Sequence, residues 1–293
     1  MNVFVAGGTG YIGNHVIDAL VKDGHRVRAL VRRGSEQKVS NKRIEFRYGD
    51  ISDPASLNST LDGCDAVIYL IGLIREFPSK GISFELAHVD GVRHLYTRAK
   101  LSGIKRWVQI SANGVMPDTP DGYRRTKYRA EEFIKVQDIN YTIVRPSVVF
   151  GEETDRSVNF VTTVKNIIQS TPFLVPVIGN GDYRMQPVHV DDLAKVVSLI
   201  VDRPSTFNKT YSVCGAKSVS YNDIIDNITV RYNLKKKMKI HIPAMLVRTL
   251  AVLLQNIESF PVTVEQIDML VGGNTCGDSY LFDELGITPK GFS

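Results

Sequence analysis

The chain has 293 residues, of which 43% are apolar and 23% charged, and this balance excludes a disordered protein. It fits one large domain or a nucleotide-binding domain with a smaller partner. The net charge of +5 is spread out, and the densest basic run, Lys235 to Lys237 with Lys239, carries no interleaved aromatic residues. We interpret that run as a solvated turn and expect no nucleic-acid partner.

The first half of the chain alternates short apolar runs with amphipathic segments. Strands are predicted at Asn2–Ala6, Arg26–Val31, Ile44–Tyr48, Ala66–Ile71, Trp107–Ile110 and Tyr141–Val144. Helices are predicted at Ile12–Lys22, Ala55–Leu61, Phe84–Ser102 and Tyr123–Gln137. Strands alternating with helices indicate an α/β protein with a Rossmann-type, doubly wound parallel sheet.

After Gly151 the alternation becomes less regular. Helices are predicted at Asn159–Gln169, Val190–Asp202, Tyr221–Tyr232, Pro243–Asn256 and Val264–Leu270, and residues 170–187 read as a Pro/Gly-rich loop with one or two short strands. We therefore expect a dinucleotide-binding domain over residues 1–150, to which residues 188–211 return. Residues 151–293 would form a smaller C-terminal, substrate-covering region.

A glycine-rich turn follows the first strand and opens the first helix. Gly7, Gly10 and Gly13 are spaced GxxGxxG, with Thr9, Tyr11 and Ile12 between them. Glycines in this context allow a tight turn and close approach to a pyrophosphate, which the helix N-terminus then stabilises. The alternative is a merely structural turn.

The end of the second strand indicates which dinucleotide binds. Arg32 and Arg33 lie 19 and 20 residues beyond Gly13, where an NAD site usually has an acid, and a guanidinium there can hold a 2′-phosphate. We predict NADP(H), with NAD as second choice; the alternative is that both arginines point to solvent. Asp50 and Ile51 after the third strand are expected near the adenine.

Ile71 and Gly72 end the fourth predicted strand and are expected to face the ribose and pyrophosphate. Tyr123 and Lys127, four residues apart, share one face of a predicted helix. An ammonium beside a phenol lowers the phenol's pKa, which would let Tyr123 act as a general acid or base. Lys127 could also bind the nicotinamide ribose.

The motifs GGTGYIG, GDISD, YRRTKYRAEE, VRPSVVFG and QPVHVDDLA together resemble the extended short-chain dehydrogenase/reductase superfamily, which is NAD-dependent epimerase/dehydratase-like. TVEQIDMLVGGN and FDELGITP are similar to its atypical branch, which contains the nucleotide-binding accessory subunit of respiratory complex I. The resemblance implies that Tyr123 and Lys127 form the catalytic pair and that Pro146 and Ser147 flank the nicotinamide. It also implies that His189 and Asp191 organise loops near the site.

Two positions depart from the family pattern. The substrate-orienting Ser or Thr corresponds to Ser111, displaced by one or two places, or is replaced by Asn113. His88 stands on the fourth helix where the family tends to have Asn. Two functions therefore stay open: an oxidoreductase or epimerase acting on a hydroxyl or carbonyl substrate with Tyr123 as acid/base, and a non-catalytic dinucleotide-binding scaffold, assembly or redox-sensing protein.

The remaining expectations concern environment and partners. Cys64, Cys214 and Cys276 are odd in number and no residues show metal-ligand spacing, so we expect free or buried thiols, a reducing compartment and no metal. No secretory signal and no uninterrupted apolar stretch of 18 residues is seen, which predicts a cytoplasmic protein without a transmembrane segment. The apolar segment Ile242–Ile257 predicts a lid or core helix, or else a contact with a membrane surface or a lipophilic substrate. A nucleotide-sugar substrate and a homo-oligomer are both compatible with the sequence.

Overall fold

The computed structural model describes residues 1–152, 159–254, 263–277 and 280–292. The chain divides into two compact units, each assembled from three segments. The larger unit comprises Met1–Pro146, Val190–Val213 and Ser279–Thr288, and the smaller comprises Ser147–His189, Cys214–Asp278 and Pro289–Ser293.

The larger unit is built on a seven-stranded sheet in the order β11-β6-β5-β4-β1-β2-β3, in which every pair is parallel. The strands are β1 Asn2–Ala6, β2 Arg26–Val31, β3 Glu45–Tyr48, β4 Ala66–Tyr69, β5 Arg106–Ile110, β6 Asn140–Pro146 and β11 Lys209–Val213. The order reverses between β1 and β4, so the predicted doubly wound sheet is confirmed. In such sheets a ligand binds outside the carboxyl ends of the strands at this reversal.

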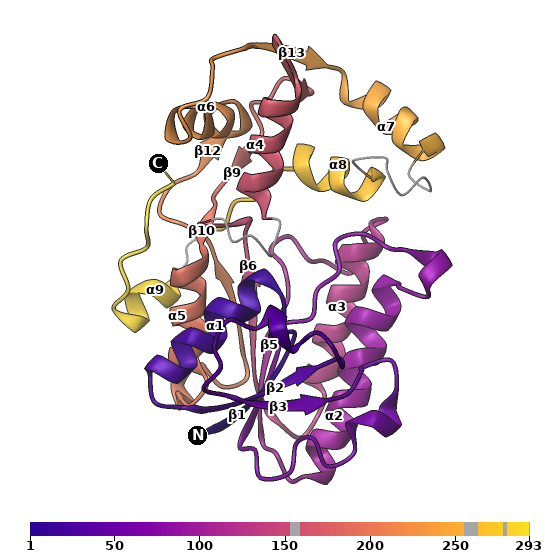
Figure 1. Ribbon diagram of the computed structural model, residues 1–293, viewed down its shortest axis with the longest axis vertical. Coiled ribbons are helices and arrows are strands. Elements are labelled where there is room, and N and C mark those ends of the chain that lie inside the picture. The colour runs from indigo at the N-terminus through magenta and orange to yellow at the C-terminus, as the bar shows by residue number, and fades with distance from the viewer. Residues whose placement is uncertain (153–158, 255–262, 278–279, 293) are drawn as a thin grey trace. The chain divides into compact units, whose positions relative to one another are not determined.

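Helices cover both faces of this sheet (Figure 1). Helices α1 (Tyr11–Lys22) and α5 (Val190–Ile200) pack against each other on one face. Helices α2 (Gly91–Leu101) and α3 (Gly122–Lys135) lie on the other face, where Leu95 and Ile134 join a fully buried core around Trp107. The central strands β1 and β4 are buried on both sides, which explains why their sequences are almost continuously apolar rather than alternating.

Two predicted helices in this unit differ in type from the expectation. Ala55–Leu61 was expected to be helical, but the structure has only a 3₁₀ turn, Pro54–Leu57, because Asp53 caps the turn and Ser59 then adopts a φ of 58° that ends it. The stretch Phe84–Ser102 is helical, but it begins as a π-helix, Glu85–Asp90, before continuing as α2. Further 3₁₀ turns span Glu36–Lys38, Pro78–Lys80 and Pro204–Thr206, and the short α9 spans Tyr280–Leu285.

The smaller unit combines short strands with four described helices. Its strands are β7 Val149–Phe150, β8 Leu174–Ile178, β9 Arg184–Met185, β10 Val188–His189, β12 Val219–Ser220 and β13 Met238–Ile242. Its helices are α4 Phe160–Ser170, α6 Tyr221–Arg231, α7 Ala244–Leu254 and α8 Val264–Val271. Its core lies between α4, α6 and the strands and contains Val164, Ile224 and Ile228. The last residues of the predicted apolar helix, beyond residue 254, lie outside the described residues.

The sequence suggested that the basic run of the smaller unit is a solvated turn, but this holds for only part of the run. Lys237 donates to the carbonyls of Ile168 and Thr171 at the end of α4, and Lys239 donates to the carbonyl of Asn222. These lysines precede or belong to β13, which pairs in parallel with β8. The run therefore fixes β13 to its neighbours, and of its four lysines only Lys235 and Lys236 are exposed.

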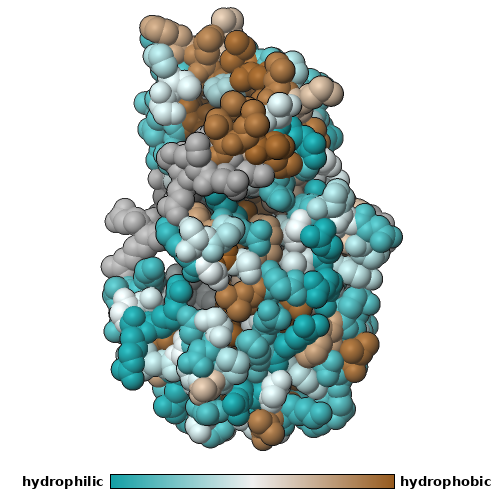
Figure 2. Space-filling model, turned by 90° about the vertical axis from the view of Figure 1, so that its right-hand side faces the viewer, coloured by the Kyte–Doolittle hydropathy of each residue, from teal (hydrophilic) through white to brown (hydrophobic). Residues whose placement is uncertain are grey.

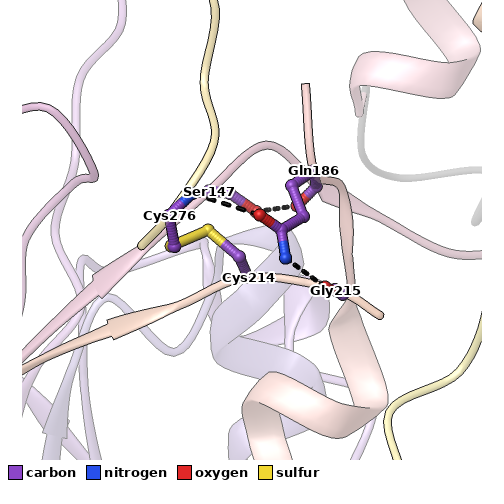
Figure 3. Close-up of a disulfide and its surroundings, with 5 residues drawn as sticks. All are labelled: Ser147, Gln186, Cys214, Gly215 and Cys276. Carbon is purple, nitrogen blue, oxygen red and sulfur yellow. Dashed lines mark hydrogen bonds between the residues drawn. A yellow bond between two sulfur atoms is a disulfide. The ribbon is translucent and has the colours of Figure 1, made fainter. Parts of the chain in front are cut away.

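A disulfide joins Cys214 to Cys276, with the two Cα atoms 6.0 Å apart (Figure 3). The expectation of three free or buried thiols is wrong for this pair, and Cys64 alone is a free, buried cysteine. The pairing could not be read from the sequence because the two cysteines are 62 residues apart and only the fold brings them together.

A Cys276→Ser variant should be less stable than the wild type by about 4 kcal/mol, since the disulfide closes a long loop in the unfolded chain. Urea unfolding with and without a thiol reductant measures this difference. The reductant should bring the wild type to the stability of the variant and leave the variant unchanged. Equal stability of the wild type with and without reductant would show that the bond does not form in solution.

No helix in the described part of the chain is both long and apolar enough to cross a bilayer.

Candidate functional site

The predicted phosphate-binding turn connects β1 to α1. Gly7 has a φ of +97°, in the left-handed region that favours glycine, and its carbonyl accepts a hydrogen bond from the N–H of Gly10 at 3.1 Å. A Cβ on Gly13 would lie 2.2 Å from the oxygen of Gly7, so a side chain there would push the turn open. Two of the three glycines are thus required by the turn itself.

The third glycine leaves room in front of the helix. Gly10 is the N-cap of α1, makes no side-chain capping bond, and is followed by a first turn without acidic residues. A Cβ on Gly10 would meet only the oxygen of Gly7, at 3.4 Å. The first N–H groups of α1 therefore lack a capping side chain and can bind an anion, so this end of the helix fits the pyrophosphate of a dinucleotide. Thr9, Tyr11 and Ile12 lie at the same turn and are partly buried.

The two arginines follow the end of β2. The side chain of Arg32 is 70% exposed and its Nη1 lies 3.9 Å from Oδ2 of Asp50, whereas the guanidinium of Arg33 lies 5.1 Å from the ring centre of Tyr48. Asp50 is held by Ser52, whose N–H and hydroxyl both donate to Oδ1. The sequence placed Asp50 near the adenine but did not show that its carboxylate lies beside Arg32. Ile51 packs against the hydrophobic core of the larger unit.

Lys127 is buried at the carboxyl ends of β4 and β5. Its Nζ donates to the carbonyls of Ile71 at 3.3 Å and Ile110 at 3.1 Å, and a Cβ on Gly72 would lie 3.4 Å from it. Burial lowers the pKa of Lys127 to about 8, partly offset by Glu131. The lysine is therefore still mostly charged at neutral pH, at the strand ends where this fold binds its ligand.

Tyr123 lies on the same face of α3 as Lys127, near the start of the helix, but its pKa is not lowered as predicted. Burial, together with Asp121, raises the pKa of Tyr123 to about 12, and Arg124 rather than Lys127 opposes the rise. The expected lowering of this pKa by Lys127 is absent, and the ammonium of Lys127 donates to the carbonyls of Ile71 and Ile110 instead. The phenol is therefore protonated at neutral pH, and it is a weaker acid than an ordinary tyrosine.

His88 lies in the π-helix and packs against Tyr123. It is the main residue of the site whose role the sequence did not reveal. Its ring lies 5.4 Å from that of Tyr123 in an edge-to-face arrangement. The N–H of Leu73 donates to Nε2, so Nδ1 carries the proton and donates to the hydroxyl of Thr126 at 2.8 Å. Burial and the charge of Lys127 lower the pKa of His88 to about 2, which keeps the ring neutral. The departure from the family's usual Asn thus produces a fixed neutral imidazole.

Ser111 directly follows β5 and is 4% exposed. Its hydroxyl makes no hydrogen bond within the part of the chain described here, although its N–H donates to the carbonyl of Val144. The N–H of Asn113 donates to the carbonyl of Pro146, the last residue of β6. The fold therefore brings the ends of β5 and β6 together. A buried hydroxyl without a partner is costly and fits a residue that awaits a ligand.

Ser147 is the first residue of the smaller unit, and its hydroxyl donates to the carbonyl of Gln186 (Figure 3). The Gln186 side chain in turn donates to the carbonyl of Gly215 and accepts from the N–H of Cys276. Gln186 thus links Ser147 to the residues around the disulfide. The assignment of Ser147 to the cofactor stays a prediction.

His189 and Asp191, which were expected to organise loops near the site, have separate roles. His189 packs edge-to-face on Phe150, at 5.0 Å between ring centres, within the smaller unit. Asp191 begins α5 in the larger unit and contacts Nδ1 of His15 on α1 at 2.9 Å. Asp191 therefore helps to hold α5 against the helix that carries the phosphate-binding turn.

The glycine turn, the open helix end and the buried lysine at the strand ends define a Rossmann protein that binds a dinucleotide of the NAD(P) type. The profile of the NAD dependent epimerase/dehydratase family matches residues 3–214, and the chain belongs to this family. The resemblance seen in the sequence motifs is therefore confirmed.

Similar proteins include both enzymes and a subunit of an electron-transport complex. The mitochondrial 40 kDa subunit of NADH-ubiquinone oxidoreductase from Neurospora crassa is 26% identical over 97% of this chain and 75% of its own length. The ceramide reductase of Caulobacter vibrioides is 28% identical over 66% of this chain and 58% of its own length. The NADPH-dependent quinone oxidoreductase of Escherichia coli, solved with NADPH, matches with a TM-score of 0.77 at 19% identity, covering 99% of this chain and 96% of its own.

Proposed function

We propose that this protein is an NADP(H)-dependent oxidoreductase or epimerase acting on a hydroxyl or carbonyl group, with Tyr123 as the general acid/base. The observation that carries this proposal is the buried, charged Lys127 at the carboxyl ends of β4 and β5, on the same helix as Tyr123. Placing an ammonium in a buried position is costly, and a cofactor hydroxyl or phosphate beside it would offset the cost. Ser111 is the proposed third member, because its hydroxyl is buried and without a partner.

In this proposal each part of the cofactor has its own residues. Lys127 binds the nicotinamide ribose and the Arg32/Arg33 pair binds the 2′-phosphate. The other proposed contacts are Gly7 to Gly13 for the pyrophosphate, Asp50 and Ile51 for the adenine, Ile71 and Gly72 for the ribose, and Pro146 and Ser147 for the nicotinamide. The nicotinamide supplies hydride transfer when it is bound. Tyr123, protonated at neutral pH, gives its proton to the substrate oxygen or takes it back.

Replacing Arg32 and Arg33 together by Ala should weaken NADPH binding by about 10–100-fold and leave NADH binding almost unchanged, because only NADPH has the 2′-phosphate. Calorimetric titration of both cofactors measures the difference. Arg26→Ala, at the opposite end of β2, is the matched control and should change neither affinity. Equal losses for NADPH and NADH in the double variant would remove the assignment.

The substrate class is proposed from the relatives rather than from this chain's own residues. The ceramide reductase and quinone oxidoreductase, by their names, act on lipophilic compounds. We propose a lipophilic carbonyl compound first and a nucleotide-sugar second, and we propose that the smaller unit confers the selectivity. A screen of such compounds that follows NADPH oxidation, after identifying the nucleotide that copurifies by mass spectrometry, tests this choice.

The second candidate function is a non-catalytic dinucleotide-binding scaffold, assembly or redox-sensing protein. Its support is the Neurospora relative, named as a subunit of NADH-ubiquinone oxidoreductase, which matches nearly the whole chain. Firm dinucleotide binding without turnover on any tested compound would favour it. A cytoplasmic location is part of neither proposal, because the Cys214–Cys276 disulfide is unusual for a strongly reducing compartment.

A further inference from the structure

Helix α7 of the smaller unit exposes an unusual number of apolar side chains. The exposed fractions are 78% for Met245, 63% for Leu246, 48% for Leu250, 53% for Val252 and 71% for Leu253. At 3.6 residues per turn these side chains share one side of the helix, whereas Ala251 on the other side is fully buried. Helix α7 therefore buries one side in its own unit, and no described residue covers its second, apolar side.

The neighbouring strand extends the exposed apolar side. Met238 and Ile240 alternate along β13 and are 69% and 45% exposed, and Phe173, whose carbonyl accepts from the N–H of Met238, is 76% exposed. Figure 2 shows hydrophobic side chains gathered on one face of the smaller unit, which carries these elements. Scattered exposed apolar residues are normal, but a contiguous patch marks an interaction surface.

The segment that carries β13 and α7 has charged residues of one sign only. Residues 227–254 contain no Asp or Glu, although they include Arg231, Lys235, Lys236, Lys237, Lys239 and Arg248. Lys239 pairs with Asp226 on α6 and Arg248 with Asp268 on α8. Lys235 and Lys236 are exposed and have no ion-pair partner among the described residues. The patch is therefore bordered by uncompensated positive charge.

We propose that α7 and β13 form a membrane-binding surface that lies on a bilayer containing anionic lipids. A helix of 11 residues extends about 16 Å, too short to span the hydrocarbon core, so it lies in the plane of the interface. Exposed Leu, Met and Val side chains enter the boundary of the acyl chains, and Lys235 and Lys236 approach the anionic headgroups.

The same features disfavour a protein partner. In a symmetric pair of this chain the lysines of one copy would lie near those of the other, which opposes association. Protein interfaces are enriched in aromatic residues at their centre, whereas Phe173 is the one aromatic residue among the exposed apolar residues named for this patch. A bilayer requires only apolar side chains at the right depth and positive charge beside them, and both are present here.

The test is flotation of the 293-residue protein with vesicles of phosphatidylcholine, with and without phosphatidylglycerol. We expect binding to the anionic vesicles that weakens in high salt. Leu246→Gln with Leu253→Gln should lower the partition coefficient by about tenfold or more, and so should Lys235→Glu with Lys236→Glu. The matched control is Leu101→Gln with Val136→Gln, which removes equally exposed apolar side chains from α2 and the end of α3 in the larger unit.

The control pair should bind vesicles as the wild type does, and circular dichroism should show all variants folded. The proposal is overturned if the wild type does not float with anionic vesicles, or if the Leu246/Leu253 pair of substitutions leaves the partition unchanged. Light scattering without lipid gives a further check. A wild-type dimer that those two substitutions convert to a monomer would assign the surface to a second copy of the chain and overturn the bilayer.

Discussion

A Gly10→Val variant should fold normally and bind NADPH at least about two orders of magnitude more weakly than the wild type, or not at all. The Cβ of the added side chain would meet only the oxygen of Gly7, at 3.4 Å, so we expect the variant to fold. The side chain projects instead in front of the uncapped N-terminus of α1, into the space proposed for the pyrophosphate. Calorimetric titration measures the affinity and thermal denaturation measures the fold.

Two glycine variants make this result interpretable. Gly277→Val places the same side chain where nothing lies within 4 Å, so its affinity and stability should match the wild type. Gly13→Ala forces a Cβ to 2.2 Å from the oxygen of Gly7 and should lower the melting temperature as well as the affinity. If Gly10→Val keeps wild-type affinity while folded, the phosphate site has been placed wrongly.

Turnover should fall by about 10²–10⁴-fold in a Tyr123→Phe variant at saturating cofactor, while cofactor affinity stays within about twofold. The ring contacts with His88 and Phe84 are kept by Phe, and only the hydroxyl is removed. Because the pKa of Tyr123 is about 12, the wild type carries the transferable proton at neutral pH. The readout is single-turnover oxidation of NADPH on a substrate that the wild type reduces.

Variants on the same helix serve as comparisons. Tyr128→Phe removes a phenol hydroxyl five residues further along α3 and should leave turnover unchanged. Lys127→Met should weaken both cofactor binding and turnover, because the ammonium is assigned to the ribose. Full activity in Tyr123→Phe would eliminate it as the acid/base. A wild type that turns over no compound yet holds its dinucleotide would favour the scaffold function instead.

The larger unit was predictable because its signals are local. Each buried strand is a short apolar run, and the turn between β1 and α1 needs glycines that the sequence displays. The helix over Ala55–Leu61 failed for a local reason as well: the amphipathic pattern suggested a helix, but Asn58 and the positive φ of Ser59 ended it after one turn. β13 was missed because its partner β8 is distant in sequence and its lysines suggested a turn.

The sequence proposed the members of the candidate site, and these stay predictions, but it could not give their electrostatics. Tyr123 and Lys127 were found from their spacing, yet spacing does not reveal that Lys127 donates to two backbone carbonyls or that burial raises the pKa of Tyr123. The role of His88 depends on Thr126 and on the N–H of Leu73, which only the fold brings together. How deeply a side chain is buried and where it points depend on packing, and a sequence pattern shows neither.

The interleaving of the two units has a consequence for how the chain is synthesised and how it can be dissected. The larger unit includes both β11 and α9. Helix α9 packs on α5 and β11, and its Glu284 accepts a hydrogen bond from Ser205. Residues 214–278, which belong to the other unit, are translated between β11 and α9. N-terminal domains often fold while the rest of a chain is still being made. Here the nucleotide-binding half can close only after most of the other half has left the ribosome. Expression of either half as one continuous fragment should therefore give an incomplete core.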